Sequence, residues 1–151
     1  MNLTKRVLVV DDDSQIRTLL SSLLERESIQ VYTAASAEEA LGIIRKCGQQ
    51  HIQVLLTDIS LPGMDGLTLC RKLRRIEPLI VTIAITGYTD LFSLLECREA
   101  GFDDYLIKPV SASVLRAALV SSFKRARYWG TIAERDIASR HKSRPNGINI
   151  T

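Results

Sequence analysis

The sequence predicts an α/β protein with a five-stranded parallel sheet and helices on both faces. Short, β-branched apolar runs alternate along the chain with longer segments whose apolar residues recur at steps of three and four. This alternation occurs five times, and we find no internal repeat. The length of 151 residues, with 46% hydrophobic and 25% charged residues, fits one ordinary globular domain followed by a short tail.

The first half of the chain contains three predicted strands and two predicted helices. The strands are residues 7–10, 30–34 and 54–57, the last of which ends at Asp58. A helix follows the first strand, because apolar residues recur at helical spacing from Ile16 to Leu24. Ser36 followed by Glu39 is a capping-box pattern, and it predicts a second helix that continues to Cys47 and is closed by Gly48.

The second half continues the alternation after a loop at Pro62 and Gly63. A helix is expected over residues 67–76, stopped by Pro78, and the apolar run 79–85 predicts a buried central strand. Residues 91–100 predict a helix that ends at Gly101, and residues 105–107 predict a short fifth strand. The last helix begins at Ser111.

The chain divides by charge into two parts, residues 1–123 and residues 124–151. The second part holds 7 basic and 2 acidic residues, so 7 − 2 = +5, which leaves 13 basic and 15 acidic residues in the first part, or −2. Apolar residues continue the helical spacing of the last helix through Trp129 to Ile137, although Gly130 weakens a helix by about 1 kcal/mol relative to Ala. We therefore predict a basic helical extension, and a disordered tail from Ser139 onward.

Partners of the extension are inferred from the same residues. A run of charge is usually a solvated face, so nucleic acid is not the expected partner of the basic residues. Tyr128 and Trp129 are instead expected to contact a partner protein or a second copy of the chain. The start of the chain has no apolar signal core and no apolar run reaches membrane-spanning length, which favours a cytoplasmic protein without membrane contact. Three cysteines without a C-x-x-C pair fit reduced thiols.

Acidic residues stand where two of the predicted strands end. Asp11, Asp12 and Asp13 follow the first strand and Asp58 ends the third, while Thr86 and Lys108 end the fourth and fifth. The carboxyl ends of parallel strands share one edge of a sheet, where ligands bind. Carboxylates in mutual contact raise one another's pKa unless a cation lies among them, and Mg²⁺ prefers oxygen ligands. With Lys108 and Thr86 nearby, the arrangement favours attack by Asp58 on phosphorus.

Four motifs in this order resemble the receiver domain of two-component response regulators. They are VLVVDDD, LLTDISLPGMDG, IAITGY and GFDDYLIKP, and the resemblance covers residues 4–122. It implies a flavodoxin-like sheet of strand order 2-1-3-4-5, as in the single-domain chemotaxis regulator. In that order the strands that carry Asp11 and Asp58 are neighbours.

The resemblance also implies a role for each site residue. Asp58 is the aspartate phosphorylated by a sensor histidine kinase or a phosphotransfer protein in a bacterial phosphorelay. Asp11 and Asp12, with the backbone carbonyl of Ser60, hold Mg²⁺ or Mn²⁺. Lys108 is the phosphate-binding lysine, and it precedes Pro109, whose peptide bond is expected to be cis. Thr86 and Tyr105 form the switch pair. Ser60 and Tyr88 tune the lifetime of the phosphoryl group. The switch pair implies a face that changes on phosphorylation, built from helix 91–100, strand 105–107 and the last helix. This face would bind a downstream protein or a second copy of the chain. The resemblance implies no turnover of a separate substrate.

Several simpler readings stand beside this one. Asp13 and Asp65 are expected to cap helices rather than bind metal. The spacing of Asp11 and Asp13 also occurs in Mg²⁺-dependent phosphatases of the haloacid dehalogenase type, but Gln15 stands where that family has Thr or Val. A receiver-like scaffold that never takes phosphate is a third reading, although such proteins usually lose an acidic residue or the lysine, and this chain keeps all of them.

Overall fold

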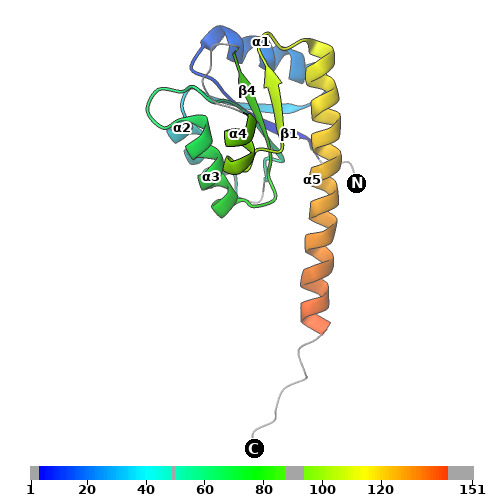
Figure 1. Cartoon of the computed structure of the whole chain (residues 1–151). Coiled ribbons are helices and arrows are strands. Elements are labelled where there is room, and N and C mark those ends of the chain that lie inside the picture. The colour runs from blue at the N-terminus through cyan, green and yellow to red at the C-terminus, as the bar shows by residue number, and fades with distance from the viewer. Residues whose placement is uncertain (1–3, 49, 88–93, 143–151) are drawn as a thin grey trace, which may run out of the picture.

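The computed structural model describes residues 4–48, 50–87 and 94–142. Within these ranges strands and helices alternate strictly, as Figure 1 shows. The strands are β1 (Arg6–Val10), β2 (Gln30–Ala34), β3 (Val54–Asp58), β4 (Val81–Thr86) and β5 (Asp104–Ile107). The helices are α1 (Ser14–Glu25), α2 (Ala37–Cys47), α3 (Gly66–Ile76), α4 (Leu94–Ala100) and α5 (Ala112–Lys142). No helix in the described residues has the length and apolarity that a bilayer crossing requires.

The strands form one parallel sheet in the order β2-β1-β3-β4-β5, which confirms the predicted fold class and strand order. The register pairs Val10 with Thr57, so β1 and β3 end side by side. Thr86 pairs with Ile107, so β4 and β5 also end together. All the polar residues that the sequence places after these strands therefore reach the same edge.

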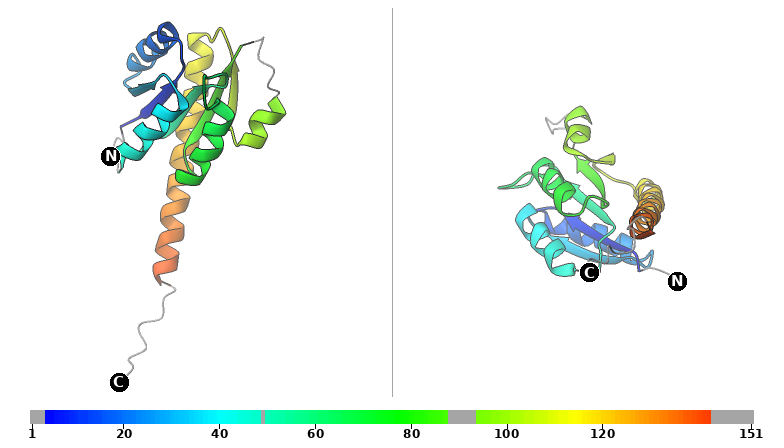
Figure 2. Two further views of the ribbon diagram at one scale, coloured as in Figure 1. Left: turned by 90° about the vertical axis from the view of Figure 1, so that its left-hand side faces the viewer. Right: turned by 90° about the horizontal axis from the view of Figure 1, so that it is seen from below.

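Helices cover both faces of the sheet. Val7 and Val9 of β1 pack in one core cluster with residues of α1 and α5, whereas Leu8 and Val10 pack in another with residues of α2 and α3. A third cluster contains residues of α3, α4 and β4. Figure 2 shows α3 and α5 on opposite sides of the sheet. Because side chains alternate across a strand, a strand buried on both faces must be apolar throughout, which explains the uninterrupted run in β1.

The predicted helix caps are confirmed. Asp13 Oδ1 accepts from the backbone N–H of Gln15, and Asp65 Oδ1 accepts from that of Thr68. Ser36 Oγ accepts from the N–H of Glu39, as a capping box requires. The carboxylate of Glu39 bonds the N–H of Ala35 rather than that of Ser36, so the reciprocal bond falls one residue earlier.

Several predicted boundaries differ from the structure by one residue, and one strand begins two residues later than expected. The strand expected over residues 79–85 begins at Val81, because Leu79 lies in the turn after Pro78 with 43% of its surface exposed. The helix expected from residue 91 is described from Leu94, and residues 91–93 lie outside the described residues.

α5 runs for 31 residues, and its C-terminal part projects beyond the body of the domain (Figure 1). We call residues 124–142 the extension. The prediction of disorder from Ser139 is wrong as far as Lys142, and residues 143–151 lie outside the described residues. Asp136 and Arg140 form an i,i+4 ion pair of 3.0 Å in the last turns, and the basic residues that end the helix complement its dipole.

Arg74 of α3 ties together the sheet edge opposite the acidic residues. Its guanidinium donates to the carbonyl oxygens of Ile80 at 2.6 Å and Gly101 at 2.7 Å, and to Thr82 Oγ1 at 2.9 Å. It also forms an ion pair with Asp103, whose carboxylate accepts from the N–H of Thr82. One side chain thus joins α3, β4 and the loop before β5, a role the sequence did not reveal.

Replacing Arg74 by methionine should destabilise the fold on the order of 3 kcal/mol, because it leaves several carbonyl groups without their charged donor and Asp103 with only the more distant Arg125. Arg75→Met is the matched control, since Arg75 is the next residue of α3 and is exposed. Urea denaturation of both variants measures the difference. Equal stability of the two variants would contradict a structural role for the Arg74 contacts.

Candidate functional site

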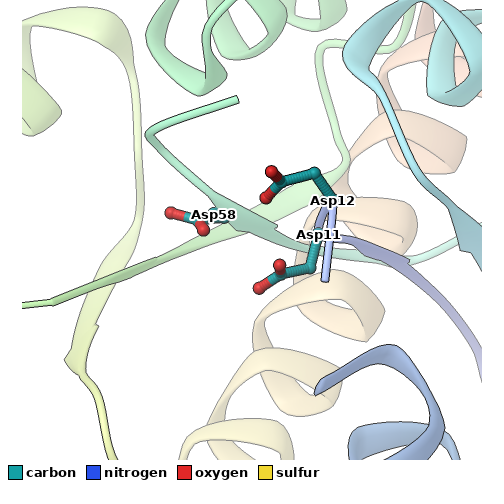
Figure 3. Close-up of side chains that lie close together, drawn as sticks. All are labelled: Asp11, Asp12 and Asp58. Carbon is teal, nitrogen blue, oxygen red and sulfur yellow. The ribbon is translucent and has the colours of Figure 1, made fainter. Parts of the chain in front are cut away.

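Three carboxylates meet at the carboxyl edge of the sheet. Asp11 and Asp12 follow β1 and Asp58 ends β3, and one oxygen of each lies within 4.8 Å of the others. Figure 3 shows the three side chains gathered at the ends of these two strands. Asp11 and Asp58 are buried, whereas Asp12 is exposed. The predicted convergence of these residues is therefore present in the described structure.

Lys108 bridges the two buried carboxylates. Its Nζ donates to Asp11 Oδ2 at 3.0 Å and to Asp58 Oδ2 at 2.9 Å. The residue directly follows β5, and its backbone N–H donates to the carbonyl of Thr86 at 2.7 Å. The bond from Lys108 to Pro109 is cis, as the resemblance implied. The lysine thus spans the edge from β5 across β4 to β3 and β1.

The electrostatics of the cluster are unbalanced. Burial raises the pKa of the Asp58 carboxyl and the neighbouring charge of Asp11 adds to this, so that the hydrogen bond and charge of Lys108 offset the rise only in part. Burial lowers the pKa of Lys108, but its bonds to Asp58 and Asp11 outweigh this and raise it overall. One ammonium group thus faces three carboxylates, a donor set that fits a divalent cation of the Mg²⁺ type.

Hydrogen bonds at the strand ends hold the carboxylates in place. Asp11 Oδ1 accepts from the N–H of Asp13 at 2.9 Å, and Asp58 Oδ1 accepts from the N–H of Ser60 at 3.1 Å. Arg17 of α1 donates from Nη1 to the backbone carbonyl of Asp11 at 2.7 Å. Sequence reasoning missed Arg17, although a basic residue one turn into the helix that follows an acidic run was a usable signal.

The loop after Asp58 is held close to the sheet. A Cβ on Gly66 would lie 2.3 Å from the carbonyl oxygen of Asp58, so only glycine permits this approach. Glu38 of α2 accepts from the N–H of Met64 at 3.0 Å, and hydrogen bonds from its own backbone N–H and that of Met64 lower the pKa of its carboxyl. Glu38 is a second residue that sequence reasoning missed.

The remaining predicted residues lie at different depths. Thr86 is fully buried at the end of β4, and Ser60 is exposed directly after β3. Tyr105 of β5 is partly buried and packs against the cluster that contains Ala84 and Phe102. Tyr88 lies outside the described residues.

Comparison with known proteins identifies the family. The model of the response regulator receiver domain matches residues 7–120. The transcriptional regulatory protein AruR of Pseudomonas aeruginosa is 40% identical over 130 residues, which are 85% of this chain and 53% of AruR. The alkaline phosphatase synthesis transcriptional regulatory protein PhoP of Bacillus subtilis is 33% identical over 124 residues, which are 82% of this chain and 50% of PhoP. The crystal structure of a response regulator receiver domain protein from Clostridium thermocellum has 32% identity and a TM-score of 0.77, over 83% of this chain and 98% of that one.

The chain belongs to the response regulator receiver domain family, as the motifs predicted. It carries a signalling domain of two-component systems. The phosphatase reading receives no support from these comparisons. The chain spans about half the length of the curated relatives it matches.

Asp58→Asn should melt at a higher temperature than the unchanged protein in EDTA at neutral pH. Because the pKa of Asp58 is raised in the folded state, folding favours the protonated form, and stability falls as pH rises from the unfolded pKa through the folded one. A neutral asparagine avoids this loss of stability. The difference in melting temperature between Asp58→Asn and the unchanged protein should therefore narrow as the pH falls toward about 4. Differential scanning calorimetry measures it.

The control is Asp65→Asn, which keeps the cap of α3 because asparagine caps as well as aspartate. A lower melting temperature for Asp58→Asn than for this control would mean that the ionised carboxylate stabilises the fold.

Proposed function

We propose that Asp58 accepts a phosphoryl group from the phosphohistidine of a sensor histidine kinase or of a phosphotransfer protein. The single observation that carries this proposal is the position of Lys108 Nζ, 2.9 Å from Asp58 Oδ2 and beside a carboxylate cluster suited to a divalent cation. A nucleophilic carboxylate with fixed positive charge beside it is the arrangement that phosphoryl transfer needs.

The step balances with the residues of this site. A carboxylate oxygen of Asp58 forms the new O–P bond, the P–N bond to the donor imidazole breaks, and its electron pair stays on the imidazole nitrogen. Lys108, now bonded to Asp58, would then donate to a phosphoryl oxygen. Asp11, Asp12, Asp58 and the carbonyl oxygen of Ser60 would hold Mg²⁺ or Mn²⁺, which supplies positive charge to the phosphoryl oxygens when bound.

The response would start at the ends of β4 and β5. Thr86, buried at the end of β4, would turn its hydroxyl toward the phosphoryl group, and Tyr105 would move further into the cluster that it already touches. α4, β5 and α5 would change together as the face presented to a downstream protein or to a second copy. Ser60 and Tyr88 would set the lifetime of the phosphoryl group by flanking the approach of water. We assign these roles to residues 1–123, with residues 124–151 as an appended segment.

Incubation with a small phosphodonor and Mg²⁺ should add one phosphoryl group to the protein and none to Asp58→Asn. The mass of the intact protein measures this directly. Asp13→Asn is the control, because Asp13 caps α1 and lies in the same acidic run.

Lys108→Ala should still take up phosphate, but without the change at α4, β5 and α5, since its ammonium would no longer contact the new group. Full phosphorylation of Asp58→Asn would refute the assignment of Asp58, and no uptake by the unchanged protein would favour the scaffold reading.

Asp12→Ala should weaken Mg²⁺ binding at least tenfold without lowering the melting temperature in EDTA. Asp12 is an exposed member of the cluster, whereas Asp11 and Asp58 form the ion pairs with Lys108. Titration calorimetry measures binding, because Trp129 lies in the extension and its fluorescence should barely respond. Asp104→Ala, an exposed aspartate at the start of β5, is the control. A loss of stability without loss of Mg²⁺ affinity would assign Asp12 a structural role.

A further inference from the structure

Asp12 differs from the other two carboxylates of the acidic cluster in how its side chain is held. Asp11 and Asp58 each bond Lys108, and each also accepts a backbone N–H. Among the residues that the structure describes, none donates to the carboxylate of Asp12 or forms an ion pair with it. Asp12 nevertheless contributes an oxygen within 4.8 Å of the others, and Figure 3 shows its side chain directed from the end of β1 toward Asp58. The backbone on either side of Asp12 must therefore set this direction.

Arg17 of α1 holds that backbone on both sides. Its Nη1 donates to the carbonyl oxygen of Asp11 at 2.7 Å, and its backbone N–H donates to the carbonyl oxygen of Asp13 at 3.1 Å. The second bond is the first of the helix and would form with other residues at this position, whereas the first bond depends on the guanidinium. The carbonyl of Asp11 and the N–H of Asp12 belong to one planar peptide group. The guanidinium therefore fixes the peptide from which Asp12 departs.

The charge of Arg17 does not explain its place beside this site. Arg17 forms no ion pair within the described residues, and its side chain is only partly buried. Its positive charge repels a bound divalent cation, so by charge alone it would weaken the site. The guanidinium contacts a carbonyl oxygen rather than a carboxylate. This contact favours a geometric role over one in balancing charge.

We propose that Arg17 is a positioning residue of the divalent-cation site, which fixes the peptide between Asp11 and Asp12 so that the carboxylate of Asp12 faces the cluster. This role rests on the proposed binding of Mg²⁺ by the cluster, and Arg17 touches neither the cation nor the phosphoryl group. Residues that orient a metal ligand from behind typically contribute about 10- to 100-fold to metal affinity. The charge and the hydrogen bond of Arg17 have opposite effects on Mg²⁺, because loss of the charge tightens binding and loss of the bond weakens it.

Titration calorimetry of the full chain with Mg²⁺ tests the sign of the effect. Arg17→Met should raise the dissociation constant about tenfold. A residue that acted through its charge alone would lower that constant on removal. Arg17→Lys should recover part of the loss, because an ammonium group can donate a charged hydrogen bond but lacks the planar reach of the guanidinium. A dissociation constant for Arg17→Met equal to or below that of the unchanged protein would overturn the positioning role.

Arg26→Met is the matched control for charge. Arg26 follows the last turn of α1, is exposed, and lies about 14 Å further along the helix than Arg17 at about 1.5 Å per residue. That distance exceeds the screening length of about 8 Å at physiological salt, so Mg²⁺ affinity should change less than about twofold. Circular dichroism in EDTA checks that the variants keep their helix content. If Arg17→Met does not fold, Arg17→Gln takes its place with the same expected direction, because a neutral amide is a weaker donor than a guanidinium.

The action through Asp12 has its own test. In a chain that already carries Asp12→Ala, Arg17→Met should change the dissociation constant less than about twofold, because the side chain that it orients is gone. An equal factor in both backgrounds would show that Arg17 acts elsewhere, and would overturn the role.

The same titrations separate this role from the proposed function. An unchanged protein that binds no Mg²⁺ would overturn the metal site and the role of Arg17 together. An unchanged protein that binds Mg²⁺ but takes up no phosphoryl group would refute Asp58 as the acceptor, and the comparison of Arg17→Met with Arg26→Met would still decide the role of Arg17.

Discussion

The two ion pairs from Lys108 to Asp11 and Asp58 are the interaction on which the arrangement of the site depends. They join the ends of β1, β3 and β5, which a parallel sheet brings to one edge and which this strand order places close together, with β1 beside β3. Burying charges is costly, and the pair contacts offset that cost only in part, since the pKa of Asp58 stays raised. The fold therefore keeps an excess of negative charge at this edge, which is what a cation-dependent phosphoryl acceptor requires.

At the opposite edge of the sheet the charges are balanced. Arg74 has its charge matched by Asp103 and its remaining donors met by carbonyl and hydroxyl oxygens, so the network there is locally compensated. A compensated network of this kind stabilises a fold, whereas strained or unbalanced groups gather where function needs them. The loops at the two edges of the sheet therefore have different roles. The contacts of Arg74 anchor α3 and the residues before β5, whereas the contacts of Gly66 and Glu38 hold the loop that follows Asp58.

The sequence predicts the elements that depend on local spacing and misses contacts that depend on the folded chain. Alternating runs define the strands, and carboxylates after two of them predict the cluster, but strand order came from the resemblance to receiver domains. Arg74 was missed because its partners Gly101 and Asp103 lie 27 and 29 residues away, beyond any local pattern. Leu79 was assigned to a strand because apolarity does not distinguish a turn residue from a buried one. The helix outlasted its periodicity at residues 140–142, where an ion pair and the helix dipole act without an apolar face.

α5 connects the two edges of the domain to the extension. Its first turns follow Lys108 and Pro109 at the acidic edge, Leu115 and Leu119 pack in the cluster that contains residues of β4 and β5, and Arg125 meets Asp103 where the helix leaves the body. A continuous helix moves as one piece, and the 19 residues of the extension reach about 28 Å beyond the body at about 1.5 Å per residue. A small rotation of α5 against the sheet is therefore a larger displacement at the tip. Whatever the extension binds must respond to the packing of α5, and that packing is set partly by the strands that carry Thr86 and Lys108.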